Sequence, residues 1–325
     1  MKKIKINYIN QFSELEIQRL VNFCETKIIE LIYDRFDFHY VRKPFFSVDK
    51  IIDELSEINH SRTITFDTIN DYQIYNLYNS FDFWFIKKLS RLNLENNHGI
   101  FTKLNYIVRD FKIDSNSSLE KNIIFFEIRS DNLDDFHLKM ENLGMKIYQL
   151  IYDLFFEMHL FNAKIQIRIP KLDQVVFFDN FFYKKQNQNY QSFINQMTLK
   201  YGVISILEEL DQNDNQNFLN EKEKLSFYYF SKYLKESLIF IEVFKRKDQK
   251  KILNNLKRIV NNKIEFNYLS EQIKKFEYQT INIKVDLDYL ILMALDIASI
   301  FEIQANKNNQ EVDDFLAKAK ITTLH

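Results

Sequence analysis

Residues that could act as metal ligands or nucleophiles are few in this chain, and they are widely spaced. The six histidines form no His-x-His or His-x-x-x-His pair, and the single cysteine, Cys24, has no partner at ligand spacing. Zinc sites need several such nitrogen or sulfur ligands close together. No Gly-x-Ser-x-Gly sequence supplies a serine nucleophile, and Cys24 lies among apolar residues, where a core role is favoured. We therefore expect neither a metal site nor covalent catalysis.

Phosphate binding by a glycine-rich loop is also disfavoured. The 325 residues include 3 glycines, against an average usage of about 7%. Such loops depend on glycine because it permits positive φ and a close approach of the backbone to the phosphate. The chain has no Gly-x-Gly-x-x-Gly sequence and no P-loop pattern. We expect no bound cofactor.

Several charged and aromatic clusters have two interpretations. The acidic "DNLDDF" (131–136) favours the first turn of a helix. The basic "FKRKDQKK" (244–251) favours a solvated loop and helix start, with an anion or partner patch as the alternative. Paired phenylalanines favour core positions, although one pair could face a partner subunit; they occur at 45–46, 125–126, 177–178 and 181–182.

Composition restricts the class of protein. Hydrophobic residues make up 46% and aromatic residues 16%, which allows a sizeable core. The net charge of -1 provides no field that would attract nucleic acid or an anionic membrane. No stretch reaches the roughly 18 apolar residues of a membrane span, and one cysteine is typical of a reducing compartment. We expect a cytoplasmic protein, without nucleic acid or membrane insertion, from an AT-rich genome such as a mollicute's.

The periodicity of apolar residues predicts helices alternating with mostly antiparallel strands, and thus an α+β fold in one domain, 1–325. Helices are expected over 13–34, 82–92, 131–160, 190–200, 247–262, 268–276 and 287–298. Strands are expected over 38–46, 63–68, 73–78, 100–111, 121–130, 163–170, 202–207, 238–246 and 278–286. The segment 211–224 is interpreted as a polar loop.

Several strings, in order and at nearly equal spacing, are similar to motifs of the ammonia-dependent asparagine synthetase (aspartate–ammonia ligase) family. They are "VRKPFFSVDKIIDELS" (41–56), "SFDFWFIKKL" (80–89), "GIFTKLNYIVRD" (99–110), "IIFFEIRSD" (123–131), "YGVISIL" (201–207) and "QTINIKVDLDYLILMALDIASI" (279–300). The resemblance implies a class II aminoacyl-tRNA synthetase-like catalytic fold with a mostly antiparallel sheet flanked by helices. It places a dimerisation helix and motif 1-like strand in 1–60, motif 2-like strands in 99–131, and a motif 3-like strand and helix in 278–300.

The family's chemistry is adenylation of aspartate by ATP, followed by attack of ammonia. Positioned cations are needed because negative charge spreads over phosphate oxygens in the transition state. At the family's catalytic positions this chain has non-matching residues: Phe83, Val108, Ile128, Ser130 and Tyr289. The motif 3 glycines become Asn282, Ile283, Lys284 and Asp286. Residual ligand-site candidates are Asp49, Arg109, Asp110 and Glu127.

The resemblance therefore implies a pseudoenzyme that serves as a structural or protein-binding subunit. Its partners would be itself or a related chain, as a dimer, and other proteins of a larger complex. One alternative is a regulatory module that binds aspartate, asparagine or adenine nucleotide without turnover. Another is a divergent active ligase, whose missing arginines would be supplied by Arg109, Arg129 or Arg168.

Overall fold

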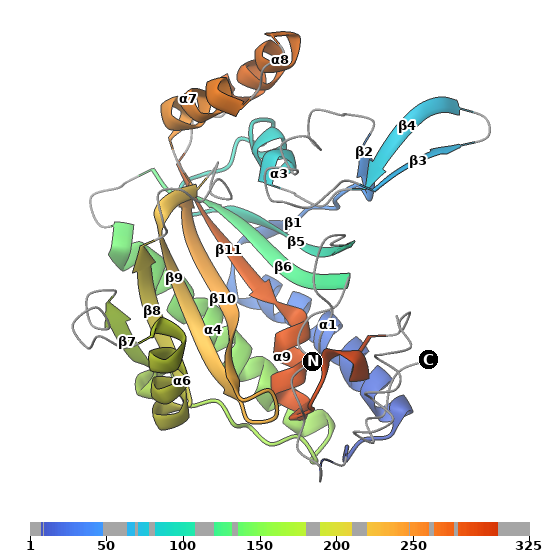
Figure 1. Cartoon of the computed structure of the whole chain (residues 1–325), viewed down its shortest axis with the longest axis vertical. Helices are drawn as coiled ribbons and strands as arrows, with labels where there is room; N and C mark the ends of the chain where they lie inside the picture. Colours follow the sequence, from blue (N-terminus) through green and yellow to red (C-terminus); the bar gives the residue numbers. More distant parts are fainter. Residues whose placement is uncertain are drawn as a thin grey trace.

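An eight-stranded sheet forms the centre of the protein (Figure 1). The computed structural model describes residues 8, 10–47, 64–68, 71–77, 82–107, 120–131, 136–179, 189–209, 220–246, 248–259, 263–275 and 279–304. The strands lie in the order β1 (Phe38–Tyr40), β5 (Gly99–Ile107), β6 (Glu120–Arg129), β11 (Thr280–Asp286), β10 (Glu236–Arg246), β9 (Asn220–Ser231), β8 (Val203–Glu209) and β7 (Val176–Asp179). The pairs β1–β5 and β7–β8 at the two edges are parallel, and the other pairs are antiparallel.

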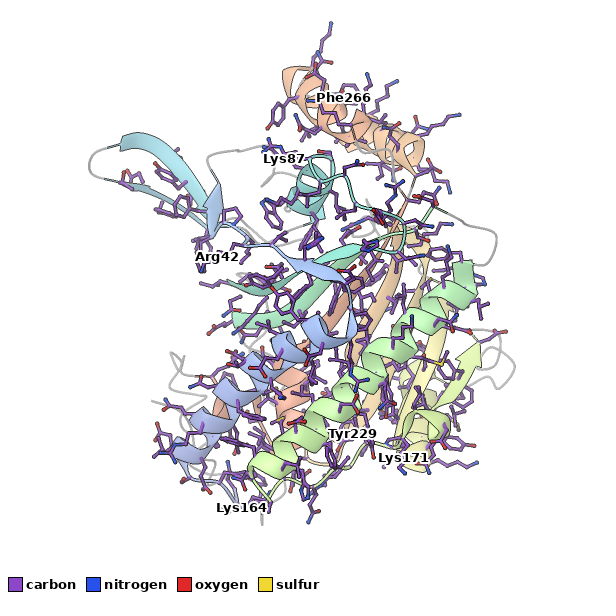
Figure 2. The ribbon with its side chains drawn as sticks, turned by 180° about the vertical axis from the view of Figure 1, so that it is seen from behind. Arg42, Lys87, Lys164, Lys171, Tyr229 and Phe266 are labelled. Atoms are coloured by element: carbon purple, nitrogen blue, oxygen red, sulfur yellow. The ribbon has the colours of Figure 1, made fainter. Side chains whose placement is uncertain are left out.

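Two long helices, α1 (Glu14–Arg35) and α4 (Phe136–Phe161), cover one face of the sheet (Figure 2). Their apolar stripes include Leu20 and Ile28 of α1 and Ile151 and Leu154 of α4, all essentially inaccessible to solvent. They pack with alternate residues of the central strands, such as Phe126. Side chains on one face recur about every 3.6 residues along a helix and every two residues along a strand. Apolar residues at these spacings therefore bury one face of each element.

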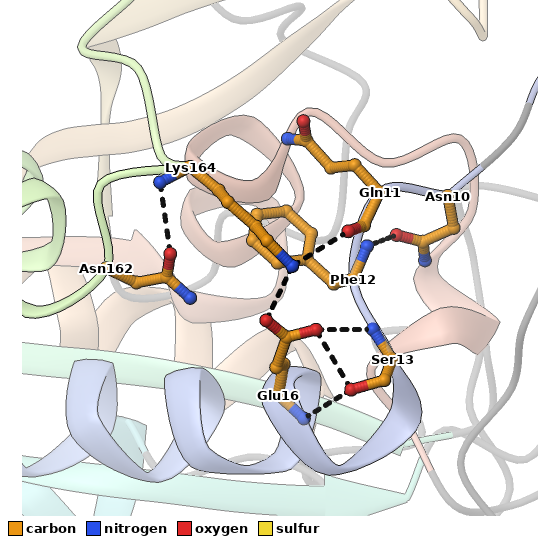
Figure 3. A network of polar contacts seen from close by, with 7 residues as sticks. All are labelled: Asn10, Gln11, Phe12, Ser13, Glu16, Asn162 and Lys164. Atoms are coloured by element: carbon orange, nitrogen blue, oxygen red, sulfur yellow. Dashed lines mark hydrogen bonds and ion pairs between the residues drawn. The ribbon is translucent and has the colours of Figure 1, made fainter.

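The first turn of α1 is held by a capping box (Figure 3). The backbone N–H of Ser13 donates to Glu16 Oε2 at 2.8 Å, and the backbone N–H of Glu16 donates to Ser13 Oγ at 3.4 Å. Lys164, which follows α4, donates to Glu16 Oε1 at 2.6 Å. The lysine and the serine together lower the pKa of Glu16 to about 2. The cap thus also joins the start of α1 to the end of α4.

Shorter helices cover the opposite face. They are α3 (Asp82–Leu89), α6 (Tyr190–Tyr201), α7 (Gln249–Ile259) and α8 (Lys263–Lys274). The helices α3, α7 and α8 share an apolar cluster with β5 and β6, whereas α6 packs on β8 and β9. A separate three-stranded sheet has the order β2 (Phe46–Ser47), β4 (Asp71–Leu77) and β3 (Thr65–Thr68), and it projects away from the main sheet (Figure 1).

Strand β11 leads directly into α9 (Leu287–Leu295), because Asp286 ends the strand and caps the helix. The backbone N–H of Tyr289 donates to Asp286 Oδ1 at 2.9 Å. The helix ends earlier than the expected residue 298, since Asp296 takes a left-handed conformation with φ 53°. A short 3-10 helix, η3 (Ile300–Glu302), follows, and another, η1 (Leu172–Gln174), precedes β7.

Several predictions about elements were wrong. Residues 163–170 contain no strand, since Ile165 and Ile169 bury their side chains from an irregular segment that returns under α4. Strand β9 was not predicted; it begins at Asn220, inside the expected polar loop, because its charged start pairs with β8 and β10. Strand β7 was not predicted. The expected strand over 38–46 is only three residues long, β1, before the chain leaves the sheet.

Other ends differ by a few residues. The basic run over 244–251 was expected to be solvated, but Phe244 and Arg246 belong to β10 and are buried. Asp131 precedes α4 instead of lying in its first turn, and the rest of the acidic cluster up to residue 135 lies outside the described residues. Of the paired phenylalanines, 125–126 are core, whereas Phe45 and Phe46 are exposed. The prediction that Cys24 is buried is confirmed.

Candidate functional site

The face of the sheet opposite α1 and α4 carries most of the polar side chains of the central strands. Because successive residues of a strand point to opposite faces, Glu127 of β6 shares this face with Asn282 of β11 and Phe244 of β10. These residues are cross-strand neighbours, with Asn282 paired to both of the others. The row they form is where the motif 2-like and motif 3-like strands of the resemblance meet.

Glu127 and Arg246 form an ion pair at the centre of this face. Arg246 Nε lies 2.8 Å from Glu127 Oε1, and its Nη2 lies 2.7 Å from Glu127 Oε2. Both side chains are 0% exposed. Thr280 of β11 also donates to Glu127 Oε1, and the guanidinium lies 6.0 Å from the centre of the Phe125 ring. A carboxylate held in two parallel bonds by arginine has little capacity left for a ligand.

Apolar side chains cover the sheet beside this pair. Phe85 of α3 stacks on Phe125 with 4.3 Å between ring centres. Trp84 packs edge-on against Phe85. Residues of α7 and α8 complete the cluster, including Ile252 and Leu269, which are fully buried. The sheet surface next to Glu127 is therefore occupied by the protein's own side chains.

The neighbouring strands β8, β9 and β10 carry a second polar network. Glu208 Oε1 accepts from the hydroxyls of Tyr190 and Tyr228, and Lys224 Nζ lies 3.2 Å from Glu208 Oε2 and 3.1 Å from Glu242 Oε1. Burial alone would lower the pKa of Lys224, but Glu242 and Glu208 outweigh it and raise the pKa. The lysine is thus held as a cation between two carboxylates.

A third group of charges lies where β11 becomes α9. Asp288 Oδ1 accepts from the Asn122 side chain at 2.8 Å, and Asp288 Oδ2 accepts from Gln304 at 2.9 Å. Burial raises the pKa of both Asp286 and Asp288, and repulsion between the two adds to the rise at Asp286. Lys121 lies 5.7 Å from the ring centre of Tyr289. These contacts hold the start of α9 against β6.

The predicted site positions do not form one cluster. Ile128 lies in the core under α1 and α4, on the other face from Glu127. Ser130 follows β6 and is buried, with its hydroxyl accepting from Lys139 at 3.1 Å. Phe83 lies in α3, and the structure describes only the backbone of this residue. Asp49, Val108, Arg109 and Asp110 lie outside the described residues.

The two described arginines that could replace those of the family are engaged elsewhere. Arg129 Nε lies 2.8 Å from Asp131 Oδ1, and Arg168 pairs with Asp296 at the far end of α9. Sequence reasoning placed Arg246 at the end of the strand expected over 238–246 and also in a solvated basic run, and it did not identify Arg246 as part of the site. The alternation of apolar residues through "LIFIEVFKR" was the available signal that this end of the strand is buried.

A cleft of about 390 Å³ lies on the other face of the sheet, between the end of α1, the start of α4 and the end of β6. Basic residues line it from three elements, and sequence reasoning did not identify it.

Within the described residues, no group of three or more His, Cys, Asp or Glu side chains could hold a metal ion. The described helices include none that is long and apolar enough to span a membrane.

The structure is similar to solved aminoacyl-tRNA synthetases. The asparaginyl-tRNA synthetase of Entamoeba histolytica in complex with asparaginyl-adenylate matches with a TM-score of 0.65 and 10% identity, over 90% of this chain and 66% of that chain. The Pyrococcus horikoshii asparaginyl-tRNA synthetase matches with a TM-score of 0.61 and 10% identity, over 88% and 66%. A putative aspartyl-tRNA synthetase from Leishmania major Friedlin has a TM-score of 0.62 and 8% identity, over 89% and 64%.

These likenesses concern the fold, and the chain spans slightly less than two thirds of each of those synthetases. No protein-family model and no curated protein matches the sequence. The expected fold is confirmed: it is a class II aminoacyl-tRNA synthetase-like fold, with a mostly antiparallel sheet flanked by helices.

Proposed function

We propose that this chain is a pseudoenzyme related to the ammonia-dependent asparagine synthetases, and that it acts as a structural or protein-binding subunit. The relation to that family within the class II fold rests on the ordered strings described above. The loss of catalysis rests on the sheet face that carries Glu127.

The ion pair between Glu127 and Arg246 is the observation that carries the proposal. At the position that the resemblance assigns to a substrate-binding acid, the carboxylate is fully buried and bound by an arginine of the same chain. A ligand that reached Glu127 would have to displace Arg246 and leave a buried charge unpaired, which costs several kcal/mol.

The remaining charges on this face are unsuited to bind a nucleoside triphosphate. Phosphoryl transfer needs an excess of positive charge around the phosphate oxygens. Here Lys224 is shared by Glu208 and Glu242, and Lys284 lies opposite Glu242 in the sheet register. The carboxylates on this face balance the cations, so ATP would gain little from entering it.

A partner-binding role is supported by apolar side chains that remain exposed on and after β1. Tyr40 is 37% exposed, Phe45 70% and Phe46 47%. Strand β1 is also an edge of the main sheet. Exposed aromatic residues beside a sheet edge are typical of surfaces that bind another chain. We propose that a second copy or a related chain covers this surface in a dimer, and that other proteins join it in a larger assembly.

A native pull-down with quantitative mass spectrometry tests the subunit role. Wild type is compared with Tyr40→Ser/Phe45→Ser, and with Leu199→Ser as a control, since Leu199 is 63% exposed on α6. We expect a defined set of partners that is lost with the double variant and kept with the control. If wild type, the double variant and Leu199→Ser recovered the same proteins in the same amounts, the proposed surface would be contradicted.

A further inference from the structure

The helix pair α7 and α8 carries a concentration of positive charge that the proposed loss of catalysis does not explain. It lies at one end of the molecule, beyond α3 (Figure 1). Residues 247–275 include eight basic and three acidic residues, whereas the rest of the chain has 36 basic and 42 acidic residues. The basic run over 244–251 continues into this helix pair. The positive charge is therefore local, although the net charge of the chain is -1.

The apolar face of α7 is used inside the protein. Ile252 and Leu256 are fully buried, and they share a cluster with Leu269 and Ile273 of α8 and with residues of α3. Gln249 Nε2 of α7 donates to Ile273 O at 3.0 Å. Among the side chains described on α7 and α8, no large apolar residue is exposed. The helix pair is thus anchored, and its described side chains offer no apolar face for insertion into a membrane.

The opposite face of α7 is basic. Lys250, Asn254 and Lys257 are exposed, and their spacing of four and three residues places them on one side of the helix. The two lysines are seven residues apart, which is two turns or about 10 Å along the axis. Neither lysine forms an ion pair with a described residue. The adjacent Lys251, by contrast, lies 3.8 Å from Asp248. This face therefore presents two ammonium groups that no described carboxylate balances.

The spacing of the two lysines matches that of carboxylates on another helix. Side chains on one face of a helix recur every three, four and seven residues, so an acidic helix laid along α7 would bring one carboxylate to each lysine. The amide of Asn254, between them, can donate to a further acceptor. Charge pairs of this kind join neighbouring helices at the flanks of coiled coils. The outer face of α7 is therefore complementary to an acidic helix.

An extended polyanion fits this surface less well. RNA or DNA would continue beyond the two turns of α7, over a chain whose other residues are acidic in excess. Proteins that bind single strands commonly add aromatic side chains on which bases stack. In this helix pair Phe266 and Tyr268 are half-buried in the apolar cluster, and Tyr268 accepts from Lys87 at 2.9 Å. A short acidic segment of a protein is favoured over nucleic acid.

We propose that the outer face of α7 binds an acidic helical segment of a partner protein, through Lys250 and Lys257. The inference rests on the proposed subunit role, because it supplies the chemistry of one partner. It concerns a different element from the exposed Tyr40 and Phe45, so the two surfaces can be tested separately.

Fluorescence anisotropy with a labelled model peptide tests the proposal. The probe is a capped alanine-based helix of about three heptads that carries two glutamates per heptad on one face. A scrambled peptide of the same composition and a single-stranded RNA of the same net charge are compared with it. The proteins are wild type, Lys250→Glu/Lys257→Glu, and the control Lys146→Glu/Lys200→Glu, whose exposed lysines lie on α4 and α6.

We expect the acidic helix to bind wild type and the control equally. Its affinity should fall at least about tenfold with the α7 variant, because two attractive pairs become repulsive. A peptide with lysine in place of glutamate should bind the α7 variant at least about tenfold more tightly than it binds wild type. This reversal separates a change of charge from a loss of folding, since an unfolded chain would not gain a partner in register.

Four results would overturn the proposal: no binding of the acidic helix at about 1 mM, equal losses in the α7 variant and the control, equal binding of the scrambled peptide, or tighter binding of the RNA than of the acidic helix. None of these results changes the outcome of the pull-down with Tyr40→Ser/Phe45→Ser. Failure of this inference is therefore distinguishable from failure of the proposed function.

Discussion

At the scale of single residues, the centre of the sheet depends on two charges that have no contact with solvent. Glu127 and Arg246 satisfy each other through two hydrogen bonds, and Thr280 supplies a third to the carboxylate. Such a pair adds little net stability compared with a well-packed apolar pair, but removing one partner leaves the other charge buried and unpaired. The pair therefore makes the sheet intolerant of a change at one of the two positions alone.

Replacing one member should be far more harmful than replacing both. We expect Arg246→Met to lower the free energy of unfolding by about 3–5 kcal/mol, and Glu127→Leu/Arg246→Met to recover most of that loss. Urea unfolding followed by circular dichroism measures both. Lys27→Ala is the control, since Lys27 forms solvent-accessible pairs with Glu30 at 3.4 Å and Glu157 at 3.6 Å, and its loss should cost much less than that of Arg246. Equal losses in the single and double variants would contradict this account.

Glu302 is a second buried carboxylate, and it joins the two ends of the described chain. Its Oε2 accepts from Tyr8 at 2.8 Å and from Asn10 at 2.6 Å. Its Oε1 accepts from the backbone N–H groups of Ala298 and Ser299. Burial raises the pKa of Glu302 to about 7, and these hydrogen bonds oppose the rise.

The raised pKa predicts that stability falls as the pH rises. The folded chain keeps the proton on Glu302 up to about pH 7, whereas the unfolded chain loses it above about pH 4.3. The folded state therefore binds more protons in this window, and stability decreases from pH 5 to pH 7.5 before it levels off. Glu302→Gln carries no charge, so its free energy of unfolding should fall less over the same window. Parallel pH profiles of the two proteins would refute the prediction.

At the scale of elements, the contact between α4 and the sheet depends on a glycine. A Cβ atom added at Gly144 would lie 2.8 Å from Phe227 Cε2 and 3.1 Å from Leu225 Cδ2, both on β9. Phe227 is fully buried and also stacks on Tyr148 of α4. The helix therefore lies close to the strand at this point, and a Cβ atom fits only if Phe227 or Leu225 shifts.

We expect Gly144→Ala to destabilise the protein, although alanine is the better helix former by about 1 kcal/mol. The clash with Phe227 should outweigh that gain and give a net loss of about 1–3 kcal/mol. Asn142→Ala, at an exposed position of the same helix, should instead raise stability by a few tenths of a kcal/mol. Differential scanning calorimetry measures both, and a Gly144→Ala protein that melts above wild type would contradict the packing argument.

Elements with a strong period were predictable, whereas those set by tertiary contacts were not. The apolar stripe predicted α1 from the residues alone, and the apolar runs predicted β6, β10 and β11. Strand β9 was missed entirely, because residues at its charged start, such as Lys224, favour a strand only through carboxylates on β8 and β10. The ion pair of Arg246 with Glu127 and the cleft behind the sheet were missed for the same reason: contacts between segments far apart in the sequence leave little local pattern.

At the scale of the whole molecule, the two faces of the main sheet are covered differently. One face is packed with paired charges and apolar side chains around Glu127, and the other carries α1, α4 and a basic cleft. Tyr40 lies on the edge strand β1 of the main sheet, Phe45 and Phe46 come after it in the chain, and all three are exposed. We propose that this fold, with its central face filled, serves to hold other chains in place.

The exposed aromatic surface predicts self-association or pairing with a related chain. For self-association, we expect size-exclusion chromatography with light scattering to give twice the mass of the chain, and Tyr40→Ser/Phe45→Ser to give a single chain, because these rings lose their apolar contact. Leu199→Ser should remain a dimer. If wild type ran as a single chain and no partner were recovered from cell extract, the proposed interface would be wrong.

The central claim is that the fold no longer catalyses adenylation, and pyrophosphate exchange tests it most directly. The purified chain is incubated with ATP, Mg²⁺, labelled pyrophosphate and either aspartate or asparagine, beside an active ammonia-dependent asparagine synthetase as the positive control. We predict no exchange above the level of a protein-free blank, and no asparagine when ammonia is added. Aspartate-dependent exchange that co-purifies with the chain and disappears in Arg246→Met would contradict the claim.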